Sequence, residues 1–198
     1  MSQTTPNTIR VLLLSGPLSV GKSSVTKALA QTHYFERIRS GSYLASVAAH
    51  RGIVPTRIGL QGLGDSLDLE TDFQWLIDAV AVPAFAAMPT QMSWIVDAVR
   101  KRRQVEHFKA RFAIPPFHVH LVASEATLRQ RYESRQEAGD DYVGDAPYDE
   151  AIRHPNEVAS RSLITIADLV LDIETRSPQD SAREISARAE EFWQNTVD

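Results

Sequence analysis

The chain has 198 residues, 43% of them hydrophobic and 23% charged, which is enough for one sizeable hydrophobic core. Its net charge of -4 gives no general attraction to nucleic acid or to anionic membranes. Because the sequence contains no cysteine, a disulfide framework and thiolate chemistry are both excluded.

The first predicted element is a strand over Arg10–Ser15, followed at once by the stretch GPLSVGKSS. This stretch fits the pattern G-x-x-x-x-G-K-[ST], with its fixed positions at Gly16, Gly21, Lys22 and Ser23. Such a loop turns successive backbone N–H groups towards an anion, and the helix after it adds the positive end of its dipole. We therefore expect Lys22 to contact the β- and γ-phosphates of a nucleotide and the Ser23 hydroxyl to bind Mg²⁺. The residues expected to bind ATP are Gly16, Ser19, Val20, Gly21, Lys22, Ser23 and Ser24.

Strands alternate with helices along the rest of the chain, which predicts a parallel sheet covered on both faces. The expected strands are Arg10–Ser15, one near Arg37–Arg39, Ser93–Asp97, His118–Ala123 and Ala167–Ile173. The last helix is predicted to have Ser177 as its cap and Pro178 in its first turn. The glycine-rich stretch Arg57–Ser66 and the acidic stretch Glu137–Glu150 are predicted to be mobile loops.

Charged residues follow the third strand, where ligands of an open α/β sheet bind. A carboxylate at the end of a buried strand is costly unless it is paired, and Mg²⁺ beside the phosphate loop would pair Asp97. A further role of Asp97 in orienting the attacking group, and the alternative of a helix cap, both stay open. Arg100 is expected to bind a second phosphate or carboxylate, whereas Lys101, Arg102 and Arg103 are expected to form a solvated face.

Two arginines follow the fourth strand on a helix that Ser124 is expected to cap. Arg131 and Arg135 are four residues apart and share the face of the buried stripe, so we expect them to reach the cleft. There they would neutralise the phosphoryl group in transit, with surface ion pairs as the alternative. Arg129 is expected to form a surface ion pair with Glu125.

Taken in order, these segments resemble those of P-loop kinases related to nucleoside monophosphate kinases and dephospho-CoA kinase. The matching segments are the phosphate loop, SGSYLASVAAHRG, VDAVRKRRQVEHF, LVASEATLRQRYESR and HPNE…LITIADLVLDI, within Ile9 to about Ile173. The resemblance implies an α/β P-loop NTPase fold, a three-layer sandwich with a five-stranded parallel sheet, and ATP and Mg²⁺ as donor and metal. It implies a single domain over residues 1–198. Its parts would be a core (9–41, 90–135 and 157–198), an acceptor-binding insertion (about 42–89) and a lid (about 136–156).

Carried over position by position, the resemblance also implies roles for individual residues. Ser40 and Gly41 would form the turn that opens the acceptor site, and Asp97 with Arg100 would form a D-G-x-R-like motif. Metal binding would fall to Ser23 and Asp97. The catalytic residues would be Lys22, Asp97, Arg131 and Arg135.

The acceptor side is where the sequence departs from the family pattern. Ser42 stands where many relatives have aspartate, and Ala98 stands where they have glycine. Arg51 and Arg57 are further candidates for contact with an anion of the acceptor. Aromatic residues that could either stack on a base or belong to the core are Phe73, Trp75 and Phe85. No metal or nucleophile constellation is recognisable among His50, His107, His118, His120 and His154.

The predicted function is Mg²⁺-ATP-dependent transfer of the γ-phosphate to a small phosphorylated acceptor, with a nucleoside or deoxynucleoside monophosphate preferred. A kinase of dephospho-CoA or of another small metabolite is the alternative within this class. The alternative from another class is a switch or regulatory ATPase that passes phosphate to water. Guanine-specific switches carry an N-K-x-D segment that this sequence lacks, and its D-x-x-G match, Asp141–Gly144, does not end a buried strand.

The first eight residues lack the basic start of a secretory signal. The apolar stretch Trp75–Met88 is shorter than the roughly 20 residues of a membrane span and contains a charge and a proline. We therefore expect a cytoplasmic monomer or homodimer that acts on a small molecule, with neither nucleic acid nor a membrane as partner.

Overall fold

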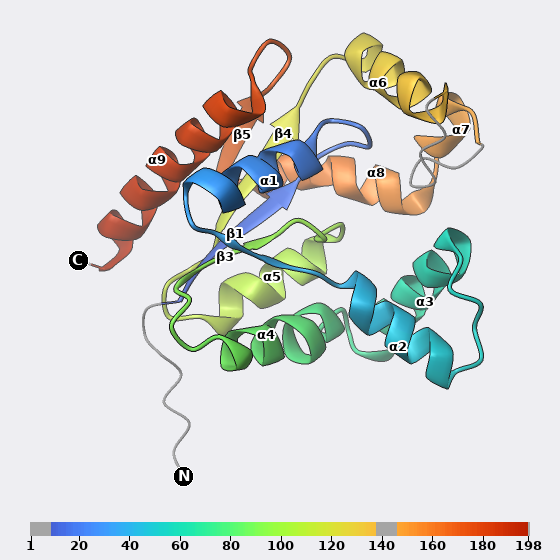
Figure 1. The fold of residues 1–198 in the computed structure, drawn as a ribbon, viewed down its shortest axis with the longest axis horizontal. Helices are drawn as coiled ribbons and strands as arrows, with labels where there is room; N and C mark the ends of the chain where they lie inside the picture. Colours follow the sequence, from blue (N-terminus) through green and yellow to red (C-terminus); the bar gives the residue numbers. More distant parts are fainter. Residues whose placement is uncertain (1–8, 138–145, 198) are drawn as a thin grey trace.

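The computed structural model describes residues 9–137 and 146–197, apart from the side chains of Arg57 and Val197 (Figure 1). Five parallel strands form one sheet in the order β2-β3-β1-β4-β5. The strands are β1 (Arg10–Ser15), β2 (Glu36–Ile38), β3 (Ser93–Val96), β4 (Phe117–Val122) and β5 (Leu169–Asp172). Each predicted strand is present within a few residues of its expected bounds, and the predicted α/β fold with a five-stranded parallel sheet is confirmed.

Helices cover both faces of this sheet (Figure 1). Those before β3 are α1 (Lys22–Thr32), α2 (Gly41–His50), α3 (Arg57–Glu70), the π-helix η1 (Leu76–Ala81) and α4 (Val82–Ala87). Those after β3 are α5 (Arg102–Arg111), α6 (Glu125–Glu137), α7 (Tyr148–Ala151), α8 (Pro155–Ser162), the 3₁₀-helix η2 (Leu163–Ile166) and α9 (Pro178–Val197). Among the described residues, no helix is both long and apolar enough to cross a membrane.

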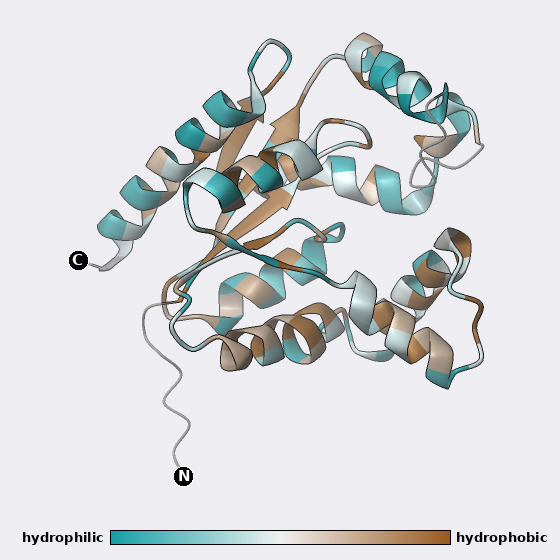
Figure 2. Cartoon of the chain, in the orientation of Figure 1, coloured by the Kyte–Doolittle hydropathy of each residue, from teal (hydrophilic) through white to brown (hydrophobic). Residues whose placement is uncertain are grey.

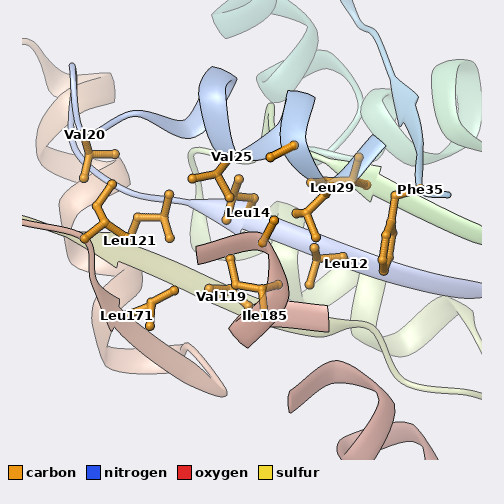
Figure 3. Close-up of a cluster of buried hydrophobic side chains, with 14 of the residues drawn as sticks. Leu12, Leu14, Val20, Val25, Leu29, Phe35, Val119, Leu121, Leu171 and Ile185 are labelled. Carbon is orange, nitrogen blue, oxygen red and sulfur yellow. The ribbon is translucent and has the colours of Figure 1, made fainter. Parts of the chain in front are cut away.

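Side chains of β1 alternate between two hydrophobic clusters, one on each face of the sheet. Leu12 and Leu14 pack with Val25 and Leu29 of α1 and with Ile185 of α9 (Figure 3). The intervening side chains of β1 pack against α3, η1 and α5 on the other face. A strand buried on both faces reads as a continuous apolar run, which is why β1 was predictable from its sequence. Figure 2 shows the hydrophobic strands at the centre and the largely hydrophilic helices α6 and α8 beside them.

The glycine-rich stretch that was predicted to be a mobile loop is instead the first part of helix α3, so that prediction was wrong. The Thr56 hydroxyl caps the helix by accepting a hydrogen bond from the backbone N–H of Gly59 at 3.1 Å. Leu63 and Leu67 are four residues apart, and both are buried on the face that packs on the core. Packing of this apolar face outweighs the helix propensity that the glycines lose, about 1 kcal/mol each.

The acidic stretch Glu137–Glu150, also predicted to be a loop, is described only at its ends. Residues 138–145 lie outside the described residues, and with them the D-x-x-G match Asp141–Gly144 and the centre of the predicted lid. The stretch ends within helix α7, which begins at Tyr148. The predicted cap of the last helix is present, since the Ser177 hydroxyl accepts a hydrogen bond from the N–H of Asp180 at 3.0 Å.

Candidate functional site

The loop between β1 and α1 has a tight backbone that two of its glycines make possible. Gly16 has φ +146°, and a Cβ atom added there would lie 2.7 Å from the carbonyl oxygen of Leu121. Gly21 has φ +109° and directly precedes the first residue of α1. L-residues with side chains rarely adopt either conformation, so the sequence pattern fixes this shape of the loop. The first amides of α1 therefore lie directly behind the loop, as an anion site requires.

The loop forms one wall of a cavity of about 640 Å³, called here the nucleotide cavity. All of the predicted ATP-binding residues except the buried Gly16 line it. They are Ser19, Val20, Gly21, Lys22, Ser23 and Ser24. The predicted pair Arg131 and Arg135 of α6 also lines this cavity, and the guanidinium Nη1 of Arg131 donates to the Val20 carbonyl at 3.0 Å. Arg176, which sequence reasoning missed, also lines this cavity. Its position just beyond the carboxyl end of β5 is the signal that could have identified it.

Lys22 lies where several charged side chains converge. Its Nζ donates to the carbonyl oxygens of Gly16 at 2.6 Å and Pro17 at 2.9 Å. Burial lowers the pKa of Lys22 to about 8, and the carboxylates of Glu157 and Asp97 oppose this shift. The positive charges of Arg100 and Arg135 lower the pKa further. The carbonyl oxygens of the loop thus hold the ammonium in place, and charged side chains from other parts of the chain shift its pKa.

Asp97 directly follows β3, and its partner is an arginine that the sequence analysis missed. Arg37 of β2 forms an ion pair with Asp97, with 2.8 Å between Nη2 and Oδ2, and its Nε donates to Oδ1 at 3.2 Å. The Thr26 hydroxyl of α1 donates to Oδ2 at 3.2 Å. The Asp97 side chain is only 7% exposed, and these contacts satisfy the buried carboxylate. Sequence spacing gave no signal for Arg37, because the contact depends on the pairing of β2 with β3.

The donor set near α1 fits a magnesium ion. Thr26, which bonds to Asp97, lies one turn after Ser23 on α1, so Asp97 lies beside the helix turn that carries Ser23. Among the described residues, no group of three or more metal-binding side chains is present. Mg²⁺ needs no such group, because it usually keeps several waters and binds through one or two protein oxygens together with substrate phosphates.

A second cavity, of about 410 Å³, lies beside the ends of β2 and β3 and is called here the acceptor cavity. Its walls come from α2, α3, the segment between β3 and α5, the start of α5 and α8, and they combine a largely apolar surface with several polar side chains. The lining residues include Ser40, Gln61, Asp65, Asp68, Trp75, Arg100, Lys101, Gln104 and Asn156. Ser40 and Arg100 were predicted at such a site. Lys101 was expected on a solvated face, which was wrong, because its ammonium lies 4.0 Å from Asp65 in the cavity wall.

Hydrogen bonds fix the inner wall of the acceptor cavity. Asp68 is buried and accepts hydrogen bonds from Trp75 Nε1 at 2.7 Å and from Gln104 Nε2 at 2.9 Å. Burial raises the pKa of the Asp68 carboxyl, although both of these hydrogen bonds oppose that shift. Gln104 also accepts from the backbone N–H groups of Arg100 and Lys101, which holds the start of α5 in place. The guanidinium of Arg100 is exposed and makes no hydrogen bond or ion pair with any described residue, so it can bind an anion.

The other predicted acceptor contacts lie elsewhere or are not described. Gly41 begins helix α2, next to Ser40. Arg51 forms an exposed ion pair with Glu70 at 2.8 Å and lines neither cavity. The side chain of Arg57 lies outside the described residues. Of the predicted acceptor residues whose side chains are described, Ser40 and Arg100 are the ones that line the second cavity.

Arg129 forms the expected kind of surface ion pair, but with a different partner. It binds Asp149 at 2.6 Å, whereas Glu125, its predicted partner, binds Arg161. The four-residue spacing of Glu125 and Arg129 on α6 predicted an ion pair between them. In the structure, Asp149 of α7 and Arg161 of α8 are their partners instead, because α7 and α8 pack beside α6.

Two histidines without a predicted role form a buried cluster beneath the phosphate loop. The Ser15 hydroxyl lies 2.7 Å from His118 Nε2 and 2.9 Å from His120 Nδ1. All three side chains are buried. Sequence spacing gave no signal for this cluster, because it depends on the parallel register of β1 and β4, which brings Ser15 opposite His120. Burial lowers the pKa of His118 and of His120 to about 4.

We expect this histidine cluster to make stability fall in mild acid. Each imidazole has an ordinary pKa of 6.5 and a folded-state pKa of about 4, so the unfolded chain binds the protons more tightly. The free energy of unfolding should therefore fall as the pH drops from 6.5 towards 4, by about 2 kcal/mol per histidine at pH 5. Urea unfolding at pH 7 and pH 5 measures this loss. A His118→Gln/His120→Gln double variant should lose less between these pH values than wild type or the exposed-site control His50→Gln. An equal loss in all three proteins would contradict the prediction.

Comparisons with known proteins agree with this architecture. Residues 11–154 match the family model AAA_33, described as an AAA domain. A proposed kinase from Chloroflexus aurantiacus j-10-fl is 18% identical with a TM-score of 0.57, over 93% of this chain and 98% of its own. A sugar kinase from Janibacter sp. HTCC2649 is 16% identical with a TM-score of 0.55, over 96% of this chain and 95% of its own. Among curated proteins, none matches the sequence.

These two structures share the fold, and neither is described as a nucleoside monophosphate kinase or a dephospho-CoA kinase. The part of the predicted resemblance that holds is therefore the P-loop kinase fold, while the narrower subfamily has no support from them. The match to the family model covers well over half of the residues. The chain belongs to the AAA_33 family of AAA domains.

Proposed function

We propose that this protein is an ATP-dependent kinase that transfers the γ-phosphate to a hydroxyl group of a small acceptor bearing one acidic group. The observation that carries this proposal is that helix α8 joins the two cavities. Asn156 lines the acceptor cavity, and the adjacent Glu157 accepts a hydrogen bond from the backbone N–H of Leu18, which lines the nucleotide cavity. A switch that passes phosphate to water needs only the first cavity. A second cavity beside the phosphate loop, with several polar side chains in its lining, favours transfer to a second substrate.

The residues predicted to bind ATP would hold the phosphate donor. The loop amides and Lys22 would hold the β- and γ-phosphates, and Arg131 with Arg135 would neutralise charge on the phosphoryl group in transit. Ser23 and Asp97 would hold Mg²⁺, Asp97 through a water. When bound, Mg²⁺ would supply positive charge that offsets the negative charge of the ATP phosphates.

The acceptor cavity has the chemistry of a site for hydroxyl groups with one anion contact. Asp65 and Asp68 present carboxylates, which accept hydrogen bonds from hydroxyl groups and repel a phosphate dianion. Arg100 offers a guanidinium to a single carboxylate or phosphate. Trp75 is the one aromatic residue that lines this cavity in the described part of the chain. Its ring already stacks on Tyr43 at 5.9 Å. This lining favours a hydroxylated acid over an acceptor that is held by base stacking.

A nucleoside monophosphate remains the second candidate. Arg100 and Lys101 are adjacent cations on the wall of the same cavity, and together they could bind the phosphate of a nucleotide. The Tyr43–Trp75 stack would then have to open or receive the base at its edge.

An acceptor screen tests the proposal. Purified protein is incubated with Mg²⁺-ATP and one acceptor at a time, ADP is measured, and products are identified by mass. The panel contains gluconate, shikimate, ribo- and deoxynucleoside monophosphates and dephospho-CoA. We expect one hydroxylated acid to raise ADP formation many-fold and to gain one phosphate. Hydrolysis at one rate across the whole panel would count against a kinase. Phosphorylation of a nucleotide alone would select the second candidate.

Replacing Arg100 by alanine should weaken acceptor binding more than ATP binding. The side chain supplies the unpaired cation of the acceptor cavity, so its loss should raise the acceptor KM about tenfold or more, corresponding to a charged hydrogen bond. The ATP KM should change much less, because Arg100 does not line the nucleotide cavity. Steady-state kinetics with each substrate varied in turn checks this, with Arg102→Ala as the neighbouring control. Equal increases in both KM values would place Arg100 outside the acceptor site.

A further inference from the structure

We propose that Glu157 is a catalytic residue of the phosphoryl transfer, whose carboxylate orients the acceptor hydroxyl and takes up its proton. This inference rests on the proposed kinase function and adds to it the group that activates the acceptor. Glu157 belongs to no sequence motif that indicates a role, and among the carboxylates only Asp97 was predicted to orient the attacking group.

The Glu157 carboxylate has one anchored oxygen and one oxygen without a partner. Oε1 accepts a hydrogen bond from the backbone N–H of Leu18 at 2.9 Å and another from Arg161 Nε at 2.8 Å. Oε2 receives no hydrogen bond from any described residue. The side chain is only 11% exposed. A carboxylate held in this way has a defined orientation and keeps one oxygen able to accept a hydrogen bond from a ligand.

Helix α8 places this carboxylate between the two cavities. On one side, the Ser160 hydroxyl donates to the Gly16 carbonyl at 3.1 Å, and Leu18, the anchor of Glu157, lines the nucleotide cavity. On the other side, Asn156 lines the acceptor cavity and donates from Nδ2 to Asp65 at 2.8 Å. Figure 1 shows α8 between the loop that follows β1 and helix α3. Two consecutive residues of one helix therefore face the acceptor cavity and the phosphate loop.

Asn156 gives an independent sign that a hydroxyl group belongs near this point. The residue is 6% exposed, and its Oδ1 is buried with no hydrogen-bond partner in the described part of the chain. A buried acceptor without a donor is costly, and such groups in native proteins usually have a functional or ligand-binding reason. A hydroxyl of the acceptor could donate to this oxygen next to Glu157.

The other carboxylates near the site are less suited to this step. Burial lowers the pKa of Lys22, and of the acids that oppose this shift Glu157 has the larger effect and Asp97 the smaller. Both oxygens of Asp97 are already engaged, by Arg37 and Thr26. Asp65 and Asp68 line the acceptor cavity, but neither is among the largest influences on the pKa of Lys22, and Asp68 already accepts hydrogen bonds from Trp75 and Gln104. Glu157 is thus the acid that combines proximity to the future γ-phosphate with an unoccupied oxygen.

The proposed step transfers the γ-phosphoryl group of ATP to the acceptor hydroxyl. The acceptor oxygen forms a bond to the γ-phosphorus while the bond from that phosphorus to the bridging oxygen breaks, and its electron pair remains on ADP. The acceptor proton passes to Glu157 Oε2 and is later released to solvent. Because transition states of phosphoryl transfer are loose, the proton moves late, and much of the benefit comes from orienting the hydroxyl.

The variant Glu157→Gln tests this role, because glutamine keeps a carbonyl oxygen for the Leu18 N–H but cannot take up a proton. With the acceptor that wild type phosphorylates fastest, we expect kcat to fall by about 100-fold or more. Titration calorimetry with Mg²⁺ and a non-hydrolysable ATP analogue should give an unchanged Kd within about threefold. The matched control is Glu150→Gln, an exposed acid on α7 that lines neither cavity and should keep wild-type kinetics. Thermal melting checks that each variant folds.

Two results would overturn the inference while leaving the kinase function intact. One is an active wild type whose Glu157→Gln variant keeps kcat within about threefold. The other is a Glu157→Gln variant that loses activity only because it no longer binds the ATP analogue, which would make Glu157 a support of the loop. If wild type itself transfers phosphate to no member of the panel, the proposed function fails and the catalytic role of Glu157 fails with it.

Discussion

Replacing Lys22 by alanine is expected to lower acceptor-dependent ATP turnover by about 100- to 1,000-fold, the usual cost of removing one preorganised group that stabilises the transition state. The ammonium is the cation that the loop itself supplies to the β- and γ-phosphates, and its burial strengthens that interaction. The fold should survive, because among the described residues the side chain donates hydrogen bonds only to the Gly16 and Pro17 carbonyls of its own loop. The kcat at saturating substrates measures the effect.

The control for this variant is Lys27→Ala. Lys27 lies on the same helix but is exposed and lines neither cavity, so its removal should leave kcat within about twofold of wild type. Circular dichroism and thermal melting should show both variants folded. A folded Lys22→Ala protein with wild-type turnover would show that the phosphate loop does not hold the transferred group.

Replacing Gly16 by alanine should destabilise the protein by about 3 kcal/mol and abolish nucleotide binding. The added Cβ would lie 2.7 Å from the Leu121 carbonyl oxygen and 3.1 Å from Val20 Cγ1, on a backbone with φ +146°. Strain of this kind and overpacking each cost about 1–3 kcal/mol, and the loop must move to relieve them. Urea unfolding gives the change in stability, and titration calorimetry with an ATP analogue gives the change in binding.

Gly62→Ala is the matched control, with an expected change of opposite sign. Gly62 is exposed within helix α3, and a Cβ atom there would meet nothing within 4 Å. Alanine should therefore stabilise the helix, by up to about 1 kcal/mol. Similar destabilisation by both substitutions would show that the loss at Gly16 is not caused by the geometry of the phosphate loop.

The sheet and the phosphate loop could be predicted because their signals are local. β1 contains a continuous apolar run of four residues, VLLL, and the loop pattern that follows the strand has a fixed spacing. Ligands of such a sheet bind beyond the carboxyl ends of its strands, which made Asp97 and Arg100, just after β3, candidates for the site. Arg131 and Arg135 were found because their helix spacing assigned them to one face, and both line the nucleotide cavity.

The contacts that were missed join residues far apart in the sequence. Arg37 and Asp97 are separated by 60 positions, Leu18 and Glu157 by 139, and Ser15 and His118 by 103. Each depends on strand order or on how α8 packs against the loop, and no local pattern contains that information. Lys101 was misplaced for the same reason, because a run of charges is usually solvated unless another element approaches it.

Helix α3 was mispredicted because its two signals compete. Its three glycines favour a loop, whereas the Thr56 cap and the buried pair Leu63 and Leu67 favour a helix. The tertiary contact decides between them, since the apolar face has the core to pack against. The same helix carries Asp65 and Asp68, so the misprediction also hid the carboxylates of the acceptor cavity.

The central claim, transfer of phosphate to an organic acceptor, is tested most directly by following the γ-phosphate itself. Protein, Mg²⁺, ATP and the best acceptor of the panel are combined, and phosphorus NMR records where the γ-phosphorus goes. We predict that it appears in a phosphate ester of the acceptor and that omitting the acceptor slows ATP consumption many-fold. Release of all γ-phosphate as inorganic phosphate, at a rate that does not depend on any acceptor, would contradict the claim and indicate a nucleotide-hydrolysing switch.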